Sequence, residues 1–230
     1  MDAGNLLDAL EAESKNIHTI WLTHSHLDHI VDIAYILDNY FTQRKETLVI
    51  YGLPQTIQAV QDDFLNNTIW PDFSSIKLTA TDKMAVEYRE IEIGKEYRIS
   101  KNETIEAFET DHTVACCGYI YKKNSAAIMV CADTYSLENA FDILHKRRDI
   151  KSLIVECSFP NEMAALAKES KHLTPDILFE QLEQLKRDDI TLYINHIKPL
   201  FMRKISEQID QKRGKWDPVI LKDEDFVYFC

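Results

Sequence analysis

The sequence predicts an α/β fold in which helices cover the outer faces of β-sheets. Stretches with the helical spacing of apolar residues alternate with short apolar runs of strand length. The chain has 230 residues, 45% of them hydrophobic, which is enough to bury one sizeable core. Only five glycines and six prolines occur, and no Gly/Ser-rich or Pro-rich linker separates two halves. We therefore expect a single domain over residues 1–230.

In the first part of the chain, helical spacing and strand-like runs follow one another closely. The expected elements are a helix over 5–13, a strand over 19–22, a helix over 30–41, a strand over 48–51 and a helix over 53–64. Pro54 falls in the first turn of the last of these helices, where its missing N–H leaves no hydrogen bond unmade.

The residue pattern predicts β-structure in the middle of the chain, with expected strands over 86–88, 96–99, 104–109, 118–121 and 126–131. Helices then return. The remaining expected elements are a helix over 137–146, a strand over 153–156, helices over 161–169 and 175–186, a strand over 191–194, a helix over 201–213 and a strand over 226–229.

Composition argues against a membrane or exported protein. The longest uncharged apolar runs, such as the one ending at Val130, are far too short to cross a bilayer. No basic segment followed by an apolar stretch opens the chain, so the sequence carries no mark for export. The five cysteines form no CxxC pair and read as reduced thiols of a cytoplasmic protein. Four lie in apolar runs and are expected to be buried small hydrophobes rather than nucleophiles: Cys116, Cys117, Cys131 and Cys157.

Charge argues against nucleic acid as a partner. Lys and Arg total 26 against 38 Asp and Glu, giving a formal net charge of −12. An acidic field repels a polyphosphate backbone, so broad nucleic-acid binding needs a local basic patch. The basic residues are scattered instead, with short clusters only at 146–148 and 212–215.

Three histidines and one aspartate gather in the segment 23–29, Thr-His-Ser-His-Leu-Asp-His. At the end of a strand, His24 and His26 project to the same side because side chains repeat with period two. Asp28 and His29 then fall on the loop or the first helical turn, placed for a second metal ion. Imidazole and carboxylate ligands suit zinc, manganese or iron, whereas calcium or magnesium prefers oxygen ligands alone. The alternative is that these are ordinary polar residues at a strand-to-helix turn. That alternative explains a single histidine well, but it does not explain four potential ligands at this spacing.

This HxHxDH segment resembles the signature of the metallo-β-lactamase superfamily, whose fold is an αββα sandwich. Three later residues match the superfamily's pattern in order: His112 in E-T-D-H, Asp133 in C-A-D-T and His196 in I-N-H. Taken alone, each is explained as well by a surface or turn position. Only their order behind the HxHxDH segment makes them ligand candidates.

The resemblance implies two divalent metal ions, zinc before manganese or iron. One ion is expected on His24, His26 and His112, and the other on Asp28, His29 and His196, with Asp133 bridging the two. His18 and His145 match no position of the pattern and are expected to be structural or exposed.

Two further segments narrow the substrate. Residues 153–161, L-I-V-E-C-S-F-P-N, and 170–175, S-K-H-L-T-P, resemble the class II cyclic nucleotide phosphodiesterases. The segments 51–54, Y-G-L-P, and 69–73, I-W-P-D-F, are similar to that family as well. The resemblance implies hydrolysis of a small-molecule substrate, a 3′,5′-cyclic nucleotide (cAMP or cGMP), to the 5′-nucleoside monophosphate by attack of a metal-bridging hydroxide.

Three residues receive catalytic roles from this resemblance. His172, oriented by Glu156, is the candidate to protonate the leaving 3′-oxygen, and Asp28 could help to orient the attacking hydroxide. Each of the first two also has a simpler explanation. Glu156 could cap the next helix as a strand-end acid, and His172 could merely precede an N-cap formed by Thr174.

Secondary roles stay open for four residues. Asp111, beside His112, could fix an imidazole or could be an exposed turn residue. Trp70, Phe73 and Phe159 could wall a purine pocket, although packing explains each of them as well.

Two other functions are alternatives to the phosphodiesterase interpretation. RNase Z, a tRNA 3′-processing endonuclease, carries comparable motifs, but the acidic charge and the missing Gly/Pro/Lys-rich arm disfavour it. A non-catalytic metal-binding scaffold of the same fold is the other alternative, which the intact ligand set disfavours.

The start of the chain departs from the superfamily's pattern. Superfamily members begin with two or more strands before an Asp-Ala-Gly segment, whereas here Asp2-Ala3-Gly4 follows Met1 directly. We expect the fold to lack its first N-terminal strands. Either a segment outside this sequence supplies them or another copy of the chain completes the sheet, which favours a homodimer.

Overall fold

The structure, a computed structural model, describes residues 1–222, 225 and 227. The chain forms two compact units, Met1–Glu92 and Ile93–Cys230. Each unit has its own β-sheet and its own apolar core, so the predicted α/β class is confirmed. The expectation of one hydrolase domain over the whole chain stays a prediction. Within the described residues, no helix combines the length and the apolar character needed to span a membrane.

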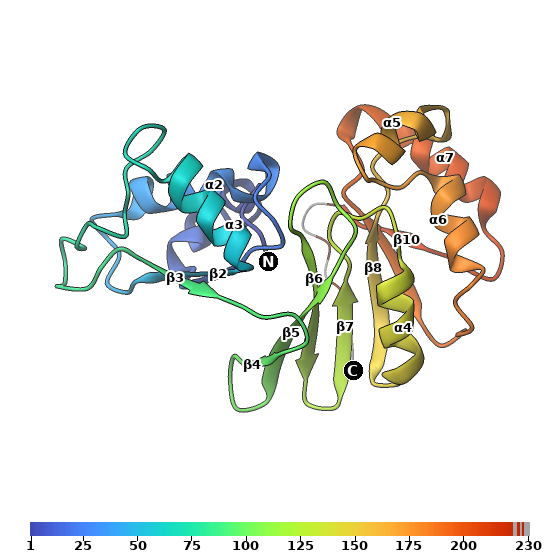
Figure 1. The fold of residues 1–230 in the computed structure, drawn as a ribbon, viewed down its shortest axis with the longest axis horizontal. Coiled ribbons are helices and arrows are strands. Elements are labelled where there is room, and N and C mark those ends of the chain that lie inside the picture. The colour runs from blue at the N-terminus through green and yellow to red at the C-terminus, as the bar shows by residue number, and fades with distance from the viewer. Residues whose placement is uncertain (223–224, 226, 228–230) are drawn as a thin grey trace. The chain divides into compact units, whose positions relative to one another are not determined.

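The N-terminal unit is built on a three-stranded parallel sheet (Figure 1). Its strands, in spatial order, are β1 (Thr19–Trp21), β2 (Leu48–Gly52) and β3 (Val86–Glu90). Its helical segments are α1 (Leu6–Leu10), the 3₁₀ helix η1 (Glu11–Asn16), α2 (Leu27–Tyr40), α3 (Pro54–Ala59) and the π-helical turn η2 (Val60–Phe64).

Helix α2 starts one turn earlier than its apolar spacing predicts, and this places two ligand candidates in its first turn. Ile30, Ile33 and Leu37 are buried in the core that also contains Ile50 of β2. Asp28 lies in the first turn, where a carboxylate is favourable beside the helix N-terminus. Apolar periodicity reports only the buried face, so it misses a first turn made of polar residues.

The C-terminal unit is built on a seven-stranded mixed sheet with the order β10-β9-β8-β7-β6-β5-β4. The strands are β4 (Glu96–Arg98), β5 (Glu103–Glu109), β6 (Cys117–Lys123), β7 (Ala126–Val130), β8 (Ile150–Glu156), β9 (Thr191–Asn195) and β10 (Val219–Ile220). Strands β4 to β7 pair antiparallel, and β7 to β10 pair parallel. The carboxyl ends of β5, β7, β8 and β9 therefore meet at one edge of the sheet.

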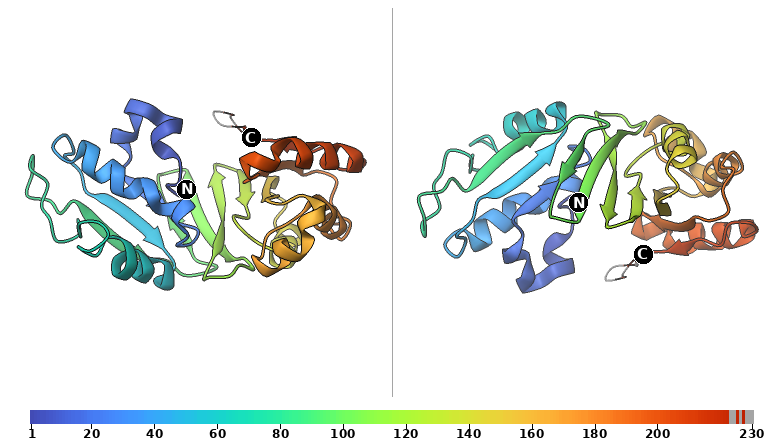
Figure 2. Two further views of the ribbon diagram at one scale, coloured as in Figure 1. Left: turned by 90° about the horizontal axis from the view of Figure 1, so that it is seen from above. Right: turned by 90° about the horizontal axis from the view of Figure 1, so that it is seen from below.

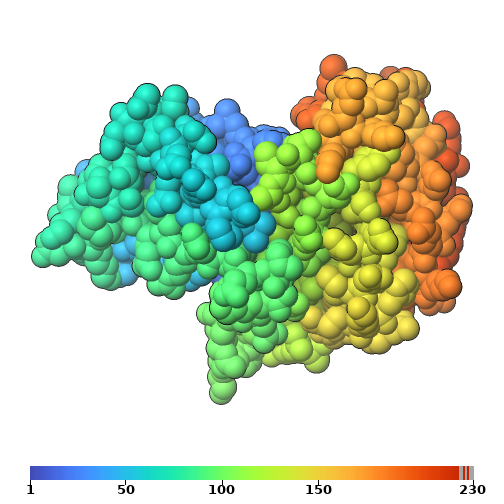
Figure 3. All heavy atoms as spheres, viewed as in Figure 1, coloured from blue at the N-terminus to red at the C-terminus, as the bar shows by residue number. Residues whose placement is uncertain are grey.

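Helices cover the apolar side of this sheet (Figure 2). The helical segments are α4 (Glu138–Lys146), η3 (Asn161–Met163), α5 (Ala164–Glu169), α6 (Pro175–Leu182), η4 (Pro199–Phe201) and α7 (Met202–Lys212). Leu144 of α4, Leu178 of α6 and Ile205 of α7 are fully buried in the core with alternate residues of β8, such as Leu153 and Val155. The outer side of α4 lies on the surface shown in Figure 3 (yellow).

Two expectations of the second half, and one strand that was not expected, need comment. Helix α6 ends at Leu182 rather than at residue 186, and the chain turns so that Arg187 can reach the backbone carbonyls of Leu144 and Ile150. Helical spacing cannot predict such a long-range contact. Strand β10 was not expected, and the strand expected over 226–229 falls on positions 226, 228 and 229, which lie outside the described residues.

Candidate metal centre

The residues of the HxHxDH segment form an N-terminal cluster at the turn from β1 to α2. His24 is fully buried and His29 almost so, whereas the Asp28 side chain is 59% exposed. His24 Nε2 lies 3.1 Å from His26 Nδ1, and the rings of His24 and His29 are 4.1 Å apart. His29 Nε2 is 3.9 Å from Asp28 Oδ2. Three imidazoles and a carboxylate thus converge within one unit, as ligands of a transition metal do.

Asp2 and Thr23 set the orientation of two of these imidazoles. Asp2 Oδ2 accepts hydrogen bonds from His29 Nδ1 at 2.9 Å and from the Thr23 hydroxyl at 2.9 Å. Because the single hydroxyl proton of Thr23 goes to Asp2, its oxygen accepts from His24 Nδ1–H at 3.0 Å. Both histidines therefore keep a lone pair on Nε2, the atom that a metal ion requires.

The segment that carries Asp2 is held tightly against the first turn of α2. Ala3 N donates to the carbonyl of His29 at 2.7 Å. A Cβ on Gly4 would lie 1.7 Å from the carbonyl oxygen of Asp28, so only glycine fits there. Sequence reasoning noticed the Asp-Ala-Gly segment but gave Asp2 no role at the metal site.

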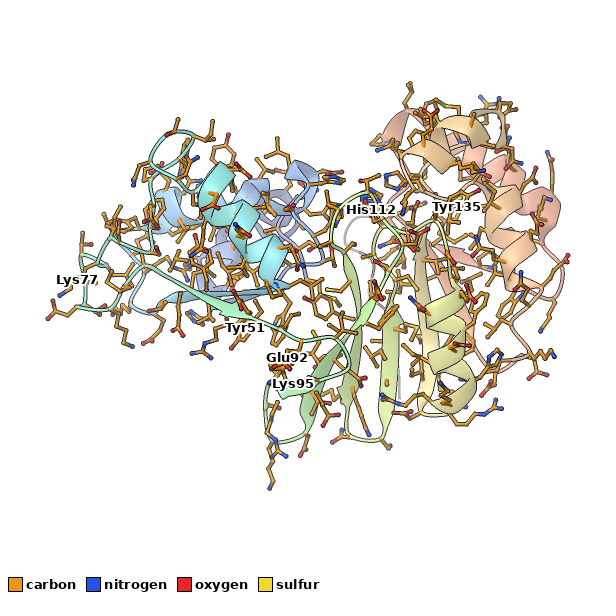
Figure 4. The ribbon with its side chains drawn as sticks, in the orientation of Figure 1. Tyr51, Lys77, Glu92, Lys95, His112 and Tyr135 are labelled. Atoms are coloured by element: carbon orange, nitrogen blue, oxygen red, sulfur yellow. The ribbon has the colours of Figure 1, made fainter. Side chains whose placement is uncertain are left out.

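A C-terminal cluster lies at the edge of the large sheet where the carboxyl ends of β5, β7, β8 and β9 meet. His112 follows β5, Asp133 follows β7 and His196 follows β9. Asp133 Oδ2 is 3.4 Å from His196 Nε2 and 3.9 Å from His112 Nε2. Figure 4 shows His112 at this edge near Tyr135, whose amide donates to the carbonyl of Asp111. The sheet topology thus gathers ligand candidates that are far apart in the sequence.

His172 joins the C-terminal cluster from the loop before α6. Its ring lies 5.1 Å from that of His112 and is stacked 5.8 Å from that of His196. Asp133, His172 and His196 each offer one ligand atom, and these three atoms all lie within 4.8 Å of one another. The position of His172 therefore fits a metal ligand as well as a proton donor.

Glu156 is the partner of His172. The carboxylate is fully buried, and its Oε1 lies 2.7 Å from His172 Nδ1. Burial lowers the pKa of His172, but the hydrogen bond and charge of Glu156, together with the charge of Asp133, raise it, and the net shift of the pKa is upward. A histidine whose protonated form is favoured by a buried carboxylate suits proton donation.

Ser158 connects these groups, and sequence reasoning missed it. Its hydroxyl lies 2.7 Å from Glu156 Oε2, 3.3 Å from His172 Nδ1 and 3.0 Å from the carbonyl of His196. Its backbone N–H donates to Glu156 Oε2 at 3.0 Å. The signal was present in the sequence, because Ser158 belongs to the E-x-S-F-P-N segment that carries the resemblance.

Backbone strain is concentrated beside both clusters. Four non-glycine residues in or next to the clusters have positive φ values between 50° and 54°: Asp2, Ala132, Lys171 and His196. Such left-handed conformations are unfavourable for residues with a Cβ and persist only where the surrounding contacts hold them.

Asp111 acts on the loop around the cluster. Its carboxylate lies 2.5 Å from Lys171 Nζ, and the carbonyl of Lys171 lies 3.3 Å from His112 Nδ1. Asp111 thereby helps to hold the loop whose carbonyl orients the His112 ring.

Two of the aromatic candidates pack within the fold, one borders the clusters, and His145 lies at the surface. Phe73 is buried and its ring packs 5.6 Å from that of Phe41, while Trp70 packs edge-on against Tyr35. Phe159 alone borders the clusters, with its ring 5.7 Å from that of His172. His145 is exposed on α4.

The four cysteines that the structure describes take no part in either cluster. Cys116, Cys117, Cys131 and Cys157 are buried free thiols, as expected. Burial raises the pKa of Cys131 and of Cys157, and thiols of raised pKa are poor nucleophiles.

Comparison with known proteins agrees with this picture. The model of the family described as cAMP phosphodiesterases class-II matches residues 4–211. The 3′,5′-cyclic-nucleotide phosphodiesterase 1 of Saccharomyces cerevisiae is 27% identical over 207 residues, which are 78% of this chain and 52% of that protein. A ribonuclease Z of Thermococcus sibiricus is 25% identical over 119 residues, 51% of this chain and 35% of that protein. The chain spans about half the length, or less, of these curated relatives.

Solved structures confirm the metallo-β-lactamase fold. The crystal structure of unliganded yeast PDE1 matches with a TM-score of 0.76 at 20% identity, covering 91% of this chain and 68% of that chain. The metallo-β-lactamase fold protein YhfI of Bacillus subtilis matches with a TM-score of 0.72 at 19% identity, covering 100% of this chain and 85% of that chain. At such identities the likeness concerns the fold alone.

Proposed function

Because the chain belongs to the family of class II cAMP phosphodiesterases, we propose that it hydrolyses 3′,5′-cyclic nucleotides to 5′-nucleoside monophosphates. In this reaction a water molecule adds to phosphorus, the bond from phosphorus to the 3′-oxygen breaks, and the 3′-oxygen takes up a proton. One observation carries the proposal to this chain: a buried Glu156–His172 pair stands beside Asp133 and His196, so a proton donor adjoins ligand candidates.

We propose that the two clusters together hold two divalent metal ions. The donor set fits this role, because the ligand candidates are imidazoles and carboxylates, and contacts at Nδ1 orient the rings of His24, His29 and His112. The proposed ligands are His24, His26 and His112 for one ion, and Asp28, His29 and His196 for the other, with Asp133 between them. When bound, such ions offset phosphate charge and make water acidic enough to ionise near neutral pH. Zinc suits this donor set best, with manganese or iron as alternatives.

His172 is proposed to give the proton to the leaving 3′-oxygen. The charge of Glu156 raises the pKa of the imidazole and so favours its protonated form, and its hydrogen bond to Nδ1 fixes the ring so that Nε2 is the donating atom. General acid help of this kind contributes about 10²–10⁴-fold. The Ser158 backbone N–H donates to Glu156, and its hydroxyl can donate to the carbonyl of His196, so Ser158 supports both the proposed proton donor and a ligand loop.

Asp28 is proposed to orient the attacking water as well as to bind metal. Its side chain is the most exposed of the N-terminal cluster, and its carboxylate lies 3.9 Å from His29 Nε2. A carboxylate that is open to solvent at the cluster can accept a hydrogen bond from water.

A ribonuclease Z-like activity is the competing proposal, favoured by the similarity of part of the chain to a ribonuclease Z. The net charge of −12 argues against it, because a tRNA substrate requires a positive surface. A metal-binding scaffold without turnover is the third candidate, and the buried, polarised Glu156–His172 pair argues against it.

The decisive experiment is hydrolysis of cAMP and cGMP by purified, metal-loaded protein, with and without a chelator. The proposal expects release of the 5′-monophosphate that the chelator abolishes and added zinc restores. Cleavage of a precursor tRNA without cyclic nucleotide turnover would instead establish the ribonuclease Z-like activity. Bound metal without either activity would support the third candidate, a metal-binding scaffold without turnover.

We also propose a cytoplasmic setting and a homodimer. Four buried free thiols fit a reducing compartment. Strand β1 is an edge strand of the three-stranded sheet, and edge strands favour pairing with another chain. Light scattering of the purified protein measures its molar mass, and the monomer mass of 26.8 kDa would contradict the dimer.

A further inference from the structure

Two deeply buried arginines differ in how their charge is compensated. Arg187, in the C-terminal unit, is 2% exposed and uses all five of its N–H donors. Three bonds go to backbone carbonyls at 2.9 to 3.0 Å, and two go to the Asp189 carboxylate at 2.7 and 2.8 Å. Arg187 therefore shows a buried guanidinium that is fully satisfied within the protein.

Arg44, in the N-terminal unit, is 4% exposed and lacks this compensation. Its guanidinium donates to the carbonyl of Ile17 at 2.7 Å and makes a long contact with that of Lys15 at 3.5 Å, while the buried Nε has no partner. Among the described residues, no carboxylate forms an ion pair with Arg44. Burial lowers the pKa of its guanidinium, as expected of a buried charge without a counter-charge.

A small pocket lies against Arg44, and its other charged walls are mainly basic. The pocket has a volume of about 290 Å³, and Lys15, His18 and Lys45 line it together with Glu46. The only acidic wall, Glu46, is already paired with Lys83, which lies 2.5 Å away. Three permanent cations thus surround a cavity in a chain whose net charge is −12.

We propose that this pocket binds a phosphate group, as free phosphate or as a phosphate monoester, which supplies the counter-charge that Asp189 supplies to Arg187. A dianion matches three surrounding cations better than a single carboxylate does. A guanidinium and lysine ammonium groups are the usual phosphate-binding side chains. The volume lies near the lower limit of ~300–1,000 Å³ for ligand sites, which suits a small ligand. The inference uses none of the proposed metal ligands and stands apart from the proposed function.

The test is calorimetric titration of the metal-loaded protein with inorganic phosphate at low ionic strength. The Lys15→Gln/Lys45→Gln variant removes two charges from exposed positions, where folding does not depend on them. We expect its phosphate affinity to fall about ten-fold, since each exposed charge contributes roughly two- to five-fold. The matched control Lys77→Gln, an exposed lysine of the same unit paired with Asp82, should bind as the wild type does.

Arg44→Gln should weaken phosphate binding further, by about 10- to 100-fold, because hydrogen bonds to charged groups are stronger than those between neutral groups. If this variant does not fold, the lysine variant decides by itself. Phosphate can also bind a metal centre, so the titration is repeated on chelator-treated wild type. Binding that survives the chelator and is lost in the lysine variant supports the pocket.

Equal phosphate affinity in wild type and the lysine variant, or binding that disappears with the metal, would overturn the proposal. Arg44 would then serve only to cap the carbonyls of Lys15 and Ile17. Tighter binding of acetate than of phosphate would also overturn it. Titration with 5′-AMP separates the two sources: a higher affinity than that of phosphate identifies a monoester, and an equal or lower one identifies free phosphate.

Discussion

The two clusters of ligand candidates, one in each unit, are assembled in different ways. The N-terminal cluster takes four ligand candidates from residues 24–29, at a single strand-to-helix turn. The C-terminal cluster takes its members from separate loops between residues 112 and 196, which meet only because strands of the large sheet end at one edge. The first cluster depends on local geometry and the second on strand order.

The supporting contacts differ in the same way. In the N-terminal cluster a single carboxylate, Asp2, holds Thr23 and His29. In the C-terminal cluster a buried network of Glu156, Ser158 and His172 is added to the ligand candidates. Under the proposed function, the N-terminal cluster binds metal, whereas the C-terminal cluster both binds metal and handles a proton. The following substitutions test that division.

The largest effect is expected for Asp133→Ala, because Asp133 is the proposed bridging ligand. Turnover should fall by at least about 10³-fold, since a metal ion supplies several kcal/mol of charge stabilisation, and the metal content should fall as well. The measurements are cyclic nucleotide hydrolysis and metal analysis of the purified variant. Asp142→Ala, an exposed carboxylate on α4, is the matched control. Wild-type turnover in Asp133→Ala would contradict the bridging role.

His172→Ala separates a proton donor from a ligand. As a proton donor, His172 can be removed with both metal ions retained while kcat falls by about 10²–10⁴-fold. Metal analysis and steady-state kinetics on the same sample measure the two quantities. His145→Ala, an exposed histidine on α4, should behave as the wild type. Loss of a metal ion from His172→Ala would make His172 a ligand and would remove the division between the clusters.

Asp2→Asn tests the N-terminal cluster through its orienting carboxylate. Without the negative charge, the hydrogen bonds to His29 and Thr23 weaken, and the affinity for metal should fall by about 10- to 100-fold. Competition with a chromogenic chelator measures that affinity. Asp8→Asn, an exposed residue of α1, provides the comparison. Unchanged metal affinity in Asp2→Asn would show that the helix turn alone positions the imidazoles.

The smallest effect is expected for Ser158→Ala. Removing the hydroxyl takes a donor from the buried Glu156 carboxylate, which should cost about 1–3 kcal/mol of unfolding free energy. We expect kcat to fall about ten-fold with KM and metal content unchanged, since Ser158 acts by positioning His172. Denaturant unfolding and kinetics measure both effects. A wild-type kcat with lowered stability would assign Ser158 a structural role, and Ser152→Ala, a buried serine within β8, controls for burial.

Local patterns were the reliable part of the sequence. The α/β class, the helix start at Pro54 and the buried cysteines were all predicted from spacing and residue type, and the structure confirms them. The clustering of His24, His26, Asp28 and His29 follows from the geometry of one turn. How these ligands are shared between two metal ions with His112 and His196 stays a prediction.

Long-range contacts were beyond the sequence patterns. The end of α6 depends on Arg187 reaching across to distant carbonyls. The role of Ser158 depends on contacts with His172 and His196, which are distant in the sequence. Such pairings arise from strand order and loop conformation, which residue periodicity does not report.

By itself, the sequence predicted the α/β class and the clustering of residues 24–29, because side-chain spacing along one strand or helix follows from backbone geometry, and its motifs carried the resemblance to the family. Only the tertiary structure decided which carboxylate orients which histidine, and which buried arginine has a counter-charge. These depend on groups brought together by folding, where burial strengthens each polar contact and makes each uncompensated charge costly.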